Sequence, residues 1–225
     1  MARVLVVAPH PDDETLGCGG ALLKHMAAGD EVFWLVCTRM TASRGYSAAQ
    51  MAAREALLAR VHHAYGFAGM KVLDFAAGGL DAVDFGALIR AVGGYIKEVA
   101  PSVIYAPNRS DVHTDHQVTA RAVWSCTKAF RQPGIAALLM YETVSETDYA
   151  PAFLENAFVP NVFVDISGFL EQKLALLALY ETELLPAPFP RSPENVRAMG
   201  VVRGGSVNVR AAEAFMLVRA VWQEK

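Results

Sequence analysis

Two short polar stretches of the sequence contain residue types that bind metal ions and transfer protons. The first, APHPDDE, spans residues 8–14 and holds one histidine and three consecutive acids. The second, NRSDVHTDHQ, spans residues 108–117 and adds two histidines three residues apart, beside further acids. Carboxylates packed this closely repel one another and resist burial unless a cation lies among them. The two stretches therefore predict the two halves of a metal site.

The donor types indicate which ion would bind. His10, His113 and His116 are three of the six histidines in the protein, and their neighbours are carboxylates rather than thiolates. Imidazole nitrogen combined with carboxylate oxygen suits Zn²⁺, or another divalent ion such as Fe²⁺. A catalytic zinc site needs three protein ligands and an open position for water. The two stretches offer enough donors for such a site.

The surrounding sequence predicts an α/β fold. Residues 4–8 form a short apolar run that is typical of a central parallel strand covered on both faces. Alternating strands and helices follow through the first half, which favours right-handed βαβ units. Further strands are expected at 31–38, 71–75, 103–106, 138–144 and 162–166, and helices at 16–28, 47–65, 85–100 and 169–184. Residues 186–193 are expected to form a proline-rich loop at the rim of a pocket.

Each polar stretch directly follows one of these strands. Residues 10–14 come after the strand at 4–8, and residues 108–116 come after the strand at 103–106. In open α/β sheets the ligand crevice lies beyond the carboxyl ends of the strands. We therefore expect the two stretches to meet in space.

Composition limits the class of protein. A chain of 225 residues with 53% hydrophobic residues can build one sizeable core, and we expect a single domain over residues 1–225. A net charge of -3 predicts no general attraction to nucleic acid, and no run reaches the ~18 apolar residues of a membrane span. The partner is expected to be a small molecule. Three scattered cysteines and no visible secretion signal favour a cytoplasmic location.

The motifs also carry a family resemblance. APHPDDETLGCGG followed by DVHTDH resembles the LmbE/PIG-L-like family of zinc-dependent de-N-acetylases, which act on N-acetylated amino sugars. The stretches YETVSET, PNVFVDIS and AEAF extend the resemblance over nearly the whole chain. It implies a Rossmann-like, three-layer fold with a mostly parallel sheet and the site at the carboxyl ends of the strands. It also implies an N-acetylated sugar substrate, such as an N-acetylglucosamine conjugate, and commonly a homo-oligomer.

The resemblance assigns the metal ligands and the general base. It implies that His10, Asp13 and His116 bind the metal and that Asp12 is the base. Such an ion polarises the acetyl carbonyl and lowers the pKa of its bound water to roughly 7. Asp12 would then accept the water proton and pass it to the leaving amine.

The remaining assignments concern the transition state and the sugar. The resemblance implies that a protonated His113 stabilises the developing negative charge and that Asp115 holds its ring. Arg54 is a candidate sugar contact on the predicted helix at 47–65, although Leu57 stands where the family often has glutamate. Arg109, beside the histidine motif, is a second candidate for substrate binding.

Two alternatives stay open on the sequence. The same metal chemistry could act on another N-acyl or N-formyl substrate that is not an amino sugar, and a large pocket with an apolar acyl end would favour that reading. A non-catalytic Rossmann-like binding module, in which the acids hold a structural cation or a ribose, is the second alternative. Asp12 or Asp13 alone could also be an ordinary helix N-cap.

Overall fold

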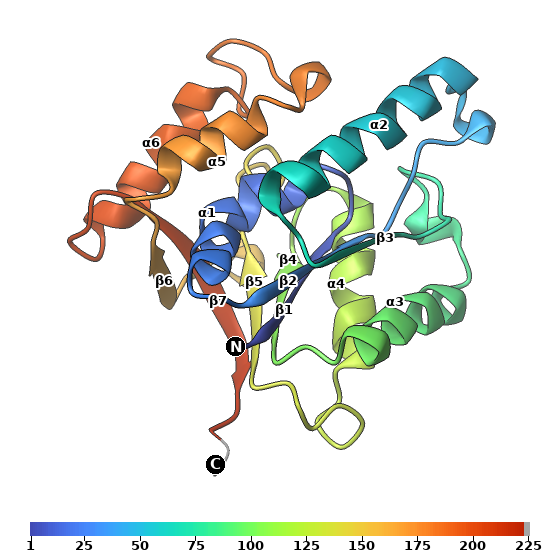
Figure 1. Cartoon of the computed structure of the whole chain (residues 1–225), viewed down its shortest axis with the longest axis horizontal. Helices are drawn as coiled ribbons and strands as arrows, with labels where there is room; N and C mark the ends of the chain where they lie inside the picture. The colour runs from blue at the N-terminus through green and yellow to red at the C-terminus, as the bar shows by residue number, and fades with distance from the viewer. Residues whose placement is uncertain (223–225) are drawn as a thin grey trace.

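The computed structural model describes residues 1–222, and these form one seven-stranded sheet between two layers of helices (Figure 1). The strand order is β3-β2-β1-β4-β5-β7-β6. Strands β1 to β5 run parallel, whereas β7 is antiparallel to both of its neighbours. The strands are β1 (Arg3–Ala8), β2 (Glu31–Val36), β3 (Gly69–Val72), β4 (Val103–Pro107), β5 (Ala137–Tyr141), β6 (Val162–Asp165) and β7 (Ala212–Ala220).

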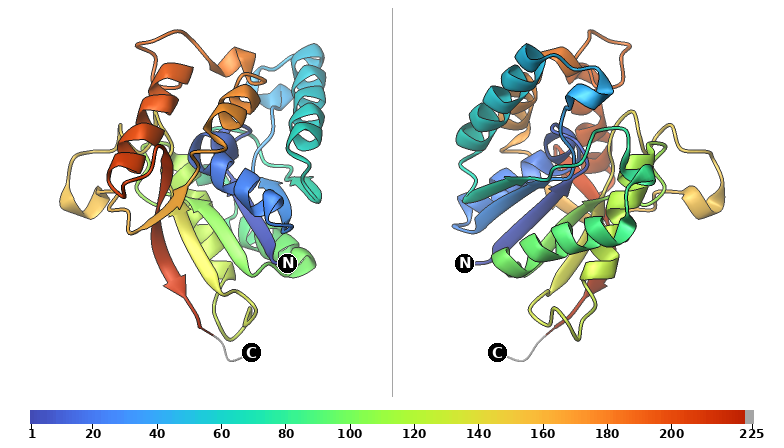
Figure 2. Two further views of the ribbon diagram at one scale, coloured as in Figure 1. Left: turned by 60° about the vertical axis from the view of Figure 1, so that its left-hand side comes forward. Right: turned by 90° about the vertical axis from the view of Figure 1, so that its right-hand side faces the viewer.

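The helices cover both faces of the sheet (Figure 2). One layer contains α1 (Asp13–Ala27), α2 (Ala48–Tyr65), α5 (Leu170–Leu177) and α6 (Pro193–Gly205). The other layer contains α3 (Phe85–Val99) and α4 (Thr114–Cys126). This arrangement confirms the Rossmann-like, three-layer α/β fold. Within residues 1–222, no helix is both long and apolar enough to cross a membrane.

The central strand β1 shows why the sheet is buried on both sides. Val4 and Val6 pack into the core beneath α1, whereas Leu5 and Val7 pack into the core beneath α3 and α4. All four side chains are fully buried. Side chains alternate between the two faces of a strand, so an uninterrupted apolar run is what a doubly covered strand requires.

Some boundaries differ from those expected. Strand β3 occupies Gly69–Val72 rather than 71–75, because it pairs in register with β2 from Phe33 to Val36. Strand β5 ends at Tyr141 rather than at 144. Helix α5 ends at Leu177 rather than at 184, because the chain turns so that Tyr180 enters the core and donates a hydrogen bond to Glu14.

Helix α6 and strand β7 were not predicted. Ser192 caps α6 and Pro193 occupies its first turn, which is a common helix start, but the loop expected at 186–193 includes both of these residues. Strand β7 lies between β5 and β6, where only tertiary pairing fixes an antiparallel strand in an otherwise parallel sheet.

Helix α1 packs very closely on the sheet. A Cβ atom at Gly17 would lie 2.2 Å from the ring of Tyr141, and one at Gly20 would lie 2.7 Å from Ile166. Glycine at these positions lets the first turns of α1 approach the carboxyl end of the sheet. Because β1 and β4 are neighbours, the turns that follow them meet at the same edge.

Candidate active site

The turn after β1 has an unusual backbone that places its acids together. Asp12 has a φ of 118°, a region that residues other than glycine rarely adopt. Its carbonyl accepts hydrogen bonds from the N–H groups of Thr15 (2.9 Å) and Leu16 (2.8 Å), so α1 begins at Asp13 at once. The side chains of Asp12 and Asp13 are both buried beside the end of β1.

The second half of the site lies at the start of α4. His113 is the N-cap of this helix, and its Nδ1 accepts a hydrogen bond of 3.0 Å from the backbone N–H of Asp115. His116 follows in the first turn and is fully buried. The spacing of three residues therefore brings both rings to one end of the helix, where they meet His10 at ring-centroid distances of 4.6 and 5.4 Å.

The three predicted metal ligands converge. Asp13 Oδ2 lies 3.4 Å from His10 Nδ1 and 3.2 Å from His116 Nε2. One donor atom from each of the three residues lies within 4.8 Å of the others. In the described part of the chain, Asp13 Oδ1 and His116 Nε2 are buried without a hydrogen-bond partner. Such orphaned polar atoms are rare, and a shared divalent cation would satisfy both of them.

The opposite ring nitrogens of the two histidines are held by carboxylates. His10 Nε2 lies 3.0 Å from Asp115 Oδ2, and His116 Nδ1 lies 2.9 Å from Asp111 Oδ2. Metal-binding histidines commonly have such a carboxylate behind them, because it fixes the ring and raises the basicity of the ligand. The residues present therefore fit a metal ion at the nitrogens that face Asp13.

These contacts correct one prediction and add one residue. Asp115 was expected to hold the ring of His113, but its carboxylate holds His10 instead. The physical reason is that the backbone N–H groups of Gly78 (2.7 Å) and Leu80 (2.9 Å) fix the carboxylate on that side. Asp111 was not predicted, although it lies within the quoted histidine stretch, five residues before His116.

A second grouping of donors, His10 with His113 and Asp115, is also close enough to hold an ion. Its carboxylate is already committed, because the two oxygens of Asp115 accept from Gly78, Leu80 and His10. His113 Nδ1 is likewise occupied by a backbone N–H. The grouping with the orphaned atoms of Asp13 and His116 is therefore the better metal site.

The electrostatics of the site favour positive charge. Burial opposes protonation of His10, but the carboxylates of Asp115 and Asp13 outweigh it and raise its pKa to about 9. Burial also opposes protonation of His116, and there Asp13 and Asp111 raise the pKa to about 10. Burial would raise the pKa of Asp13, yet His116 and His10 hold it well below its usual value. These buried acids attract a cation, whether a proton or a metal ion.

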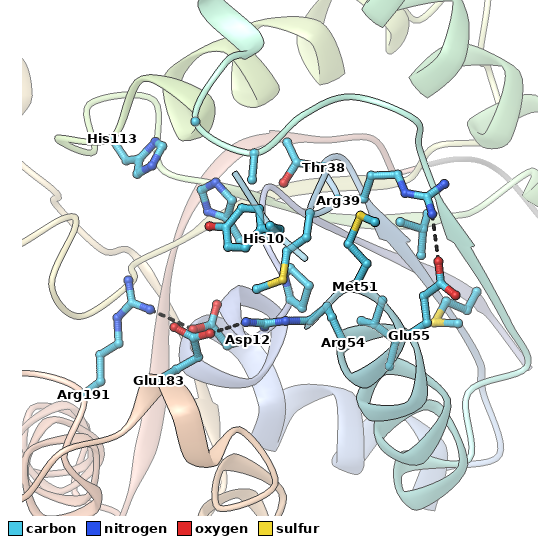
Figure 3. A pocket seen from close by; sticks show the side chains of 18 residues that line it. His10, Asp12, Thr38, Arg39, Met51, Arg54, Glu55, His113, Glu183 and Arg191 are labelled. Carbon is cyan, nitrogen blue, oxygen red and sulfur yellow. Dashed lines mark hydrogen bonds and ion pairs between the residues drawn. The ribbon is translucent and has the colours of Figure 1, made fainter. Parts of the chain in front are cut away.

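Asp12 stands in a different environment. Burial and the neighbouring charge of Asp13 raise the pKa of Asp12 well above its usual value, and Arg191 opposes this rise. Arg191 Nη1 lies 2.8 Å from Asp12 Oδ2, while Nη2 lies 3.0 Å from Glu146 Oε1 (Figure 3 shows Arg191 pointing toward Asp12). Arg191 Nε donates a further hydrogen bond of 2.8 Å to Ser145 Oγ. Asp12 is thus a buried carboxylate beside the ligand site, and the charge of Arg191 favours its ionised form.

Arg191 was missed in the sequence, where its segment was expected only to form a pocket rim. The structure does place Arg191 on the wall of a cavity that also includes His10 and Asp12. Its partners Asp12 and Glu146 lie 179 and 45 residues away, so no local spacing indicates the contact.

The surroundings of His113 favour a different protonation state from the one expected. Burial and the positive charges of His10 and His116 lower its pKa, and its Nδ1 accepts a hydrogen bond from a backbone N–H, so both effects favour the neutral ring. In that form the proton is on Nε2. A neutral imidazole can still donate a hydrogen bond from that atom.

Comparison with known proteins identifies the family. A model of the family described as PIG-L: GlcNAc-PI de-N-acetylase matches residues 5–127, which contain both polar stretches. The chain belongs to this family. One relative is the probable N-acetyl-alpha-D-glucosaminyl L-malate deacetylase 2 of Bacillus anthracis, 25% identical over 80% of this chain and 81% of its own length. Another is the 2'-N-acetylparomamine deacetylase of Streptomyces fradiae, 28% identical over 80% of this chain and 73% of its own length.

The fold is shared with solved structures. The conserved protein TT1542 of Thermus thermophilus superposes with a TM-score of 0.76 at 27% identity, covering 100% of this chain and 98% of its own. The likeness extends over the second half of the chain, beyond the residues that the PIG-L family model matches.

A cavity of about 550 Å³ opens beside the ligand site of this PIG-L family member (Figure 3). His10, Asp12 and His113 form part of its wall, together with the predicted sugar contact Arg54. Arg54 pairs with Glu183, which comes from the segment after α5 rather than from position 57 of its own helix. Arg109 is exposed, does not line this cavity and donates a hydrogen bond of 2.9 Å to the carbonyl of Glu155.

Proposed function

We propose that this protein is a metal-dependent deacetylase that hydrolyses the N-acetyl group of an amino sugar or its conjugate, giving acetate and a free amine. Zinc is the ion that the donor set suits best. The observation that carries the proposal is the pair of orphaned buried atoms, Asp13 Oδ1 and His116 Nε2, beside a buried carboxylate on the wall of a cavity. Membership of the PIG-L family supports the reaction class.

The ligands would be His10 through Nδ1, Asp13 and His116 through Nε2. A divalent ion held there would polarise the amide carbonyl and make water acidic enough to ionise near neutral pH. Asp12 accepts the proton of the attacking water and later donates it to the leaving amine. Arg191 contacts Asp12 at 2.8 Å and favours its ionised form, which is the form that a general base requires.

His113 stabilises the charge that develops on the carbonyl oxygen. Its neutral ring donates from Nε2 while the backbone N–H of Asp115 fixes Nδ1, so the donor is oriented before substrate binds. Asp115 acts at the same time through His10, because its carboxylate holds the ring of that ligand. In this proposal His113 contacts the reacting group, whereas Asp115 is a positioning residue for His10 rather than for His113.

We assign Arg54 to the sugar. Its guanidinium has five N–H donors, of which Glu183 takes one, and the residue lines the cavity. Arg109 lies outside the cavity and would contact only a substrate that extends beyond it.

The cysteines Cys18, Cys37 and Cys126 are buried and unpaired, which supports a reducing cytoplasm as the location.

The experiment is a measurement of acetate release from N-acetylglucosamine and its simple glycosides, with protein that is first stripped of metal and then loaded with zinc. Release that appears only with zinc, and that Asp12→Asn abolishes while metal stays bound, is the expected result. Metal binding without release of any acyl group from sugar or non-sugar amides would instead support the non-catalytic binding module.

A further inference from the structure

Part of the cavity has an apolar wall that the hydrolysis of an acetyl group does not require. This part is formed by α2, β3 and the segments that follow β2 and β3, and Figure 3 shows Met51 on the side of the cavity away from His113. We call it the methionine pocket, and its wall consists of Met40, Met51, Leu58, Met70, Val72 and Ala77. It is continuous with the wall that contains His10 and Asp12.

Two of these methionines have no role in the core. Met40 and Met51 are half-buried, yet within residues 1–222 they belong to neither apolar core cluster and do not pack against one. By contrast, Met70 and Val72 do pack against the core beneath α1. Methionine side chains are flexible and polarisable, so they adapt to apolar ligands of varied shape. Apolar surface left facing a cavity is covered favourably by an apolar group.

The charged groups near this wall neutralise one another. Arg39 Nη2 lies 2.8 Å from Glu55 Oε1, and Arg54 is paired with Glu183. Arg191 is engaged by Asp12 and by Glu146 on the other side of the cavity. Among the residues that the structure describes, each arginine lining the cavity therefore has a carboxylate partner that offsets its charge, so the cavity carries no unbalanced positive charge from arginine to favour an anionic substituent.

We infer that the methionine pocket binds an uncharged, apolar substituent of the substrate, either on the sugar or as an acyl chain longer than acetyl. The inference rests on the proposed deacetylase function for the position of the reacting amide. A cavity of about 550 Å³ is large enough for an amino sugar together with a further group. Such a substituent would cover Met40 and Met51, whose side chains now face the cavity.

Binding is measured on zinc-loaded Asp12→Asn protein, in which turnover is prevented, by calorimetry with two pairs of ligands. One pair is the methyl and hexyl β-glycosides of N-acetylglucosamine, and the other is N-acetyl- and N-hexanoyl-glucosamine. Each buried methylene can tighten binding by roughly threefold to fourfold. We expect the hexyl or the hexanoyl compound to bind at least about tenfold more tightly than its short partner, allowing for incomplete burial.

Matched variants locate the effect. In the Met40→Gln/Met51→Gln protein, the preference for the longer ligand should fall below about threefold, because amides of similar size replace the thioethers. Met51→Gln alone should lower the preference for the longer ligand to a value between those of the unsubstituted and doubly substituted pockets. This single variant replaces the double variant in the test if the double variant does not fold. Met26→Gln changes a half-buried methionine of α1 that does not line the cavity, and it should keep the full preference.

The outcomes separate the inference from the function on which it rests. Tighter binding in the glycoside pair places the apolar group on the sugar, and tighter binding in the acyl pair places it on the amide. No preference in either pair, or a preference that Met40→Gln/Met51→Gln leaves unchanged, overturns the inference. Tighter binding combined with no acyl release by the zinc-loaded wild-type protein would contradict the deacetylase function and leave the methionine pocket established.

Discussion

Replacing Arg191 by methionine should weaken catalysis by protonating the general base. Arg191 contacts Asp12 at 2.8 Å, and the two side chains are only 19% and 3% exposed. Burial and Asp13 raise the pKa of Asp12, so removal of Arg191 raises it further. Asp12 must be ionised to accept a proton, and a smaller fraction of the variant is therefore active at neutral pH.

The size of the effect follows from the geometry. Unit charges about 4 Å apart interact by about 4 kcal/mol at an effective dielectric constant near 20. If solvent contact leaves about one third of this, roughly 1.4 kcal/mol remains, which is a tenfold change in the protonation equilibrium. We therefore expect the acid limb of the kcat/KM profile of Arg191→Met to move to higher pH, with a loss of about tenfold or more on that limb.

The assay is kcat/KM for acetate release across pH, compared with wild type and with Arg197→Met. Arg197 pairs with Glu171 at the surface, where both side chains are largely exposed, so that variant should behave like wild type. The loss of kcat/KM in Arg191→Met, relative to wild type, should become smaller as pH rises, because at higher pH Asp12 ionises even without the charge of Arg191. A deficit of equal size at every pH, or an unchanged acid limb, would show that Arg191 does not favour the ionised form of Asp12.

Three further predictions concern the metal and the fold. Asp13→Ala should lose bound zinc and activity together, whereas Asp12→Asn should keep zinc and lose most of the rate; equal zinc content by elemental analysis would refute the ligand assignment. Zinc affinity of the metal-free protein should rise with pH, because the raised pKa of His116, about 10, means that a proton must leave before the metal binds. Competition titrations at pH 6 and 8 measure this, and equal affinities would contradict it. Lys173→Met should lower the free energy of unfolding by about 3 kcal/mol, measured in urea, because it leaves the buried carboxylate of Glu213 without its cation; a loss under about 1 kcal/mol would show that the pair is not stabilising.

The first half of the fold was predictable because local signals agree there. Strand β1 is an uninterrupted apolar run, and α2 begins with a capping box between Ser47 and Gln50, so pattern and cap point to the same elements. The second half depends on tertiary contacts. Strand β7 is fixed by antiparallel pairing on both sides, and α5 stops where Tyr180 turns inward to reach Glu14, 166 residues away.

The candidate site likewise has features that the sequence predicts and features that depend on tertiary contacts. The meeting of the two polar stretches could be predicted because each directly follows a strand, and β1 and β4 are neighbours in the sheet. The family resemblance then selected His10, Asp13 and His116 as the metal ligands, and the structure brings these three residues together. The groups that orient them could not be paired from sequence. Asp115 was placed behind the wrong histidine, because its contact with His10 spans 105 residues and depends on two backbone N–H groups from a separate loop.

A metal ion bound by His10, Asp13 and His116 can be located by anomalous diffraction at the zinc absorption edge, with crystals of the zinc-loaded protein. We expect one strong peak about 2.0–2.2 Å from His10 Nδ1, a carboxylate oxygen of Asp13 and His116 Nε2. A peak bound instead by His113 and Asp115, or no peak at either group of donors, would contradict it.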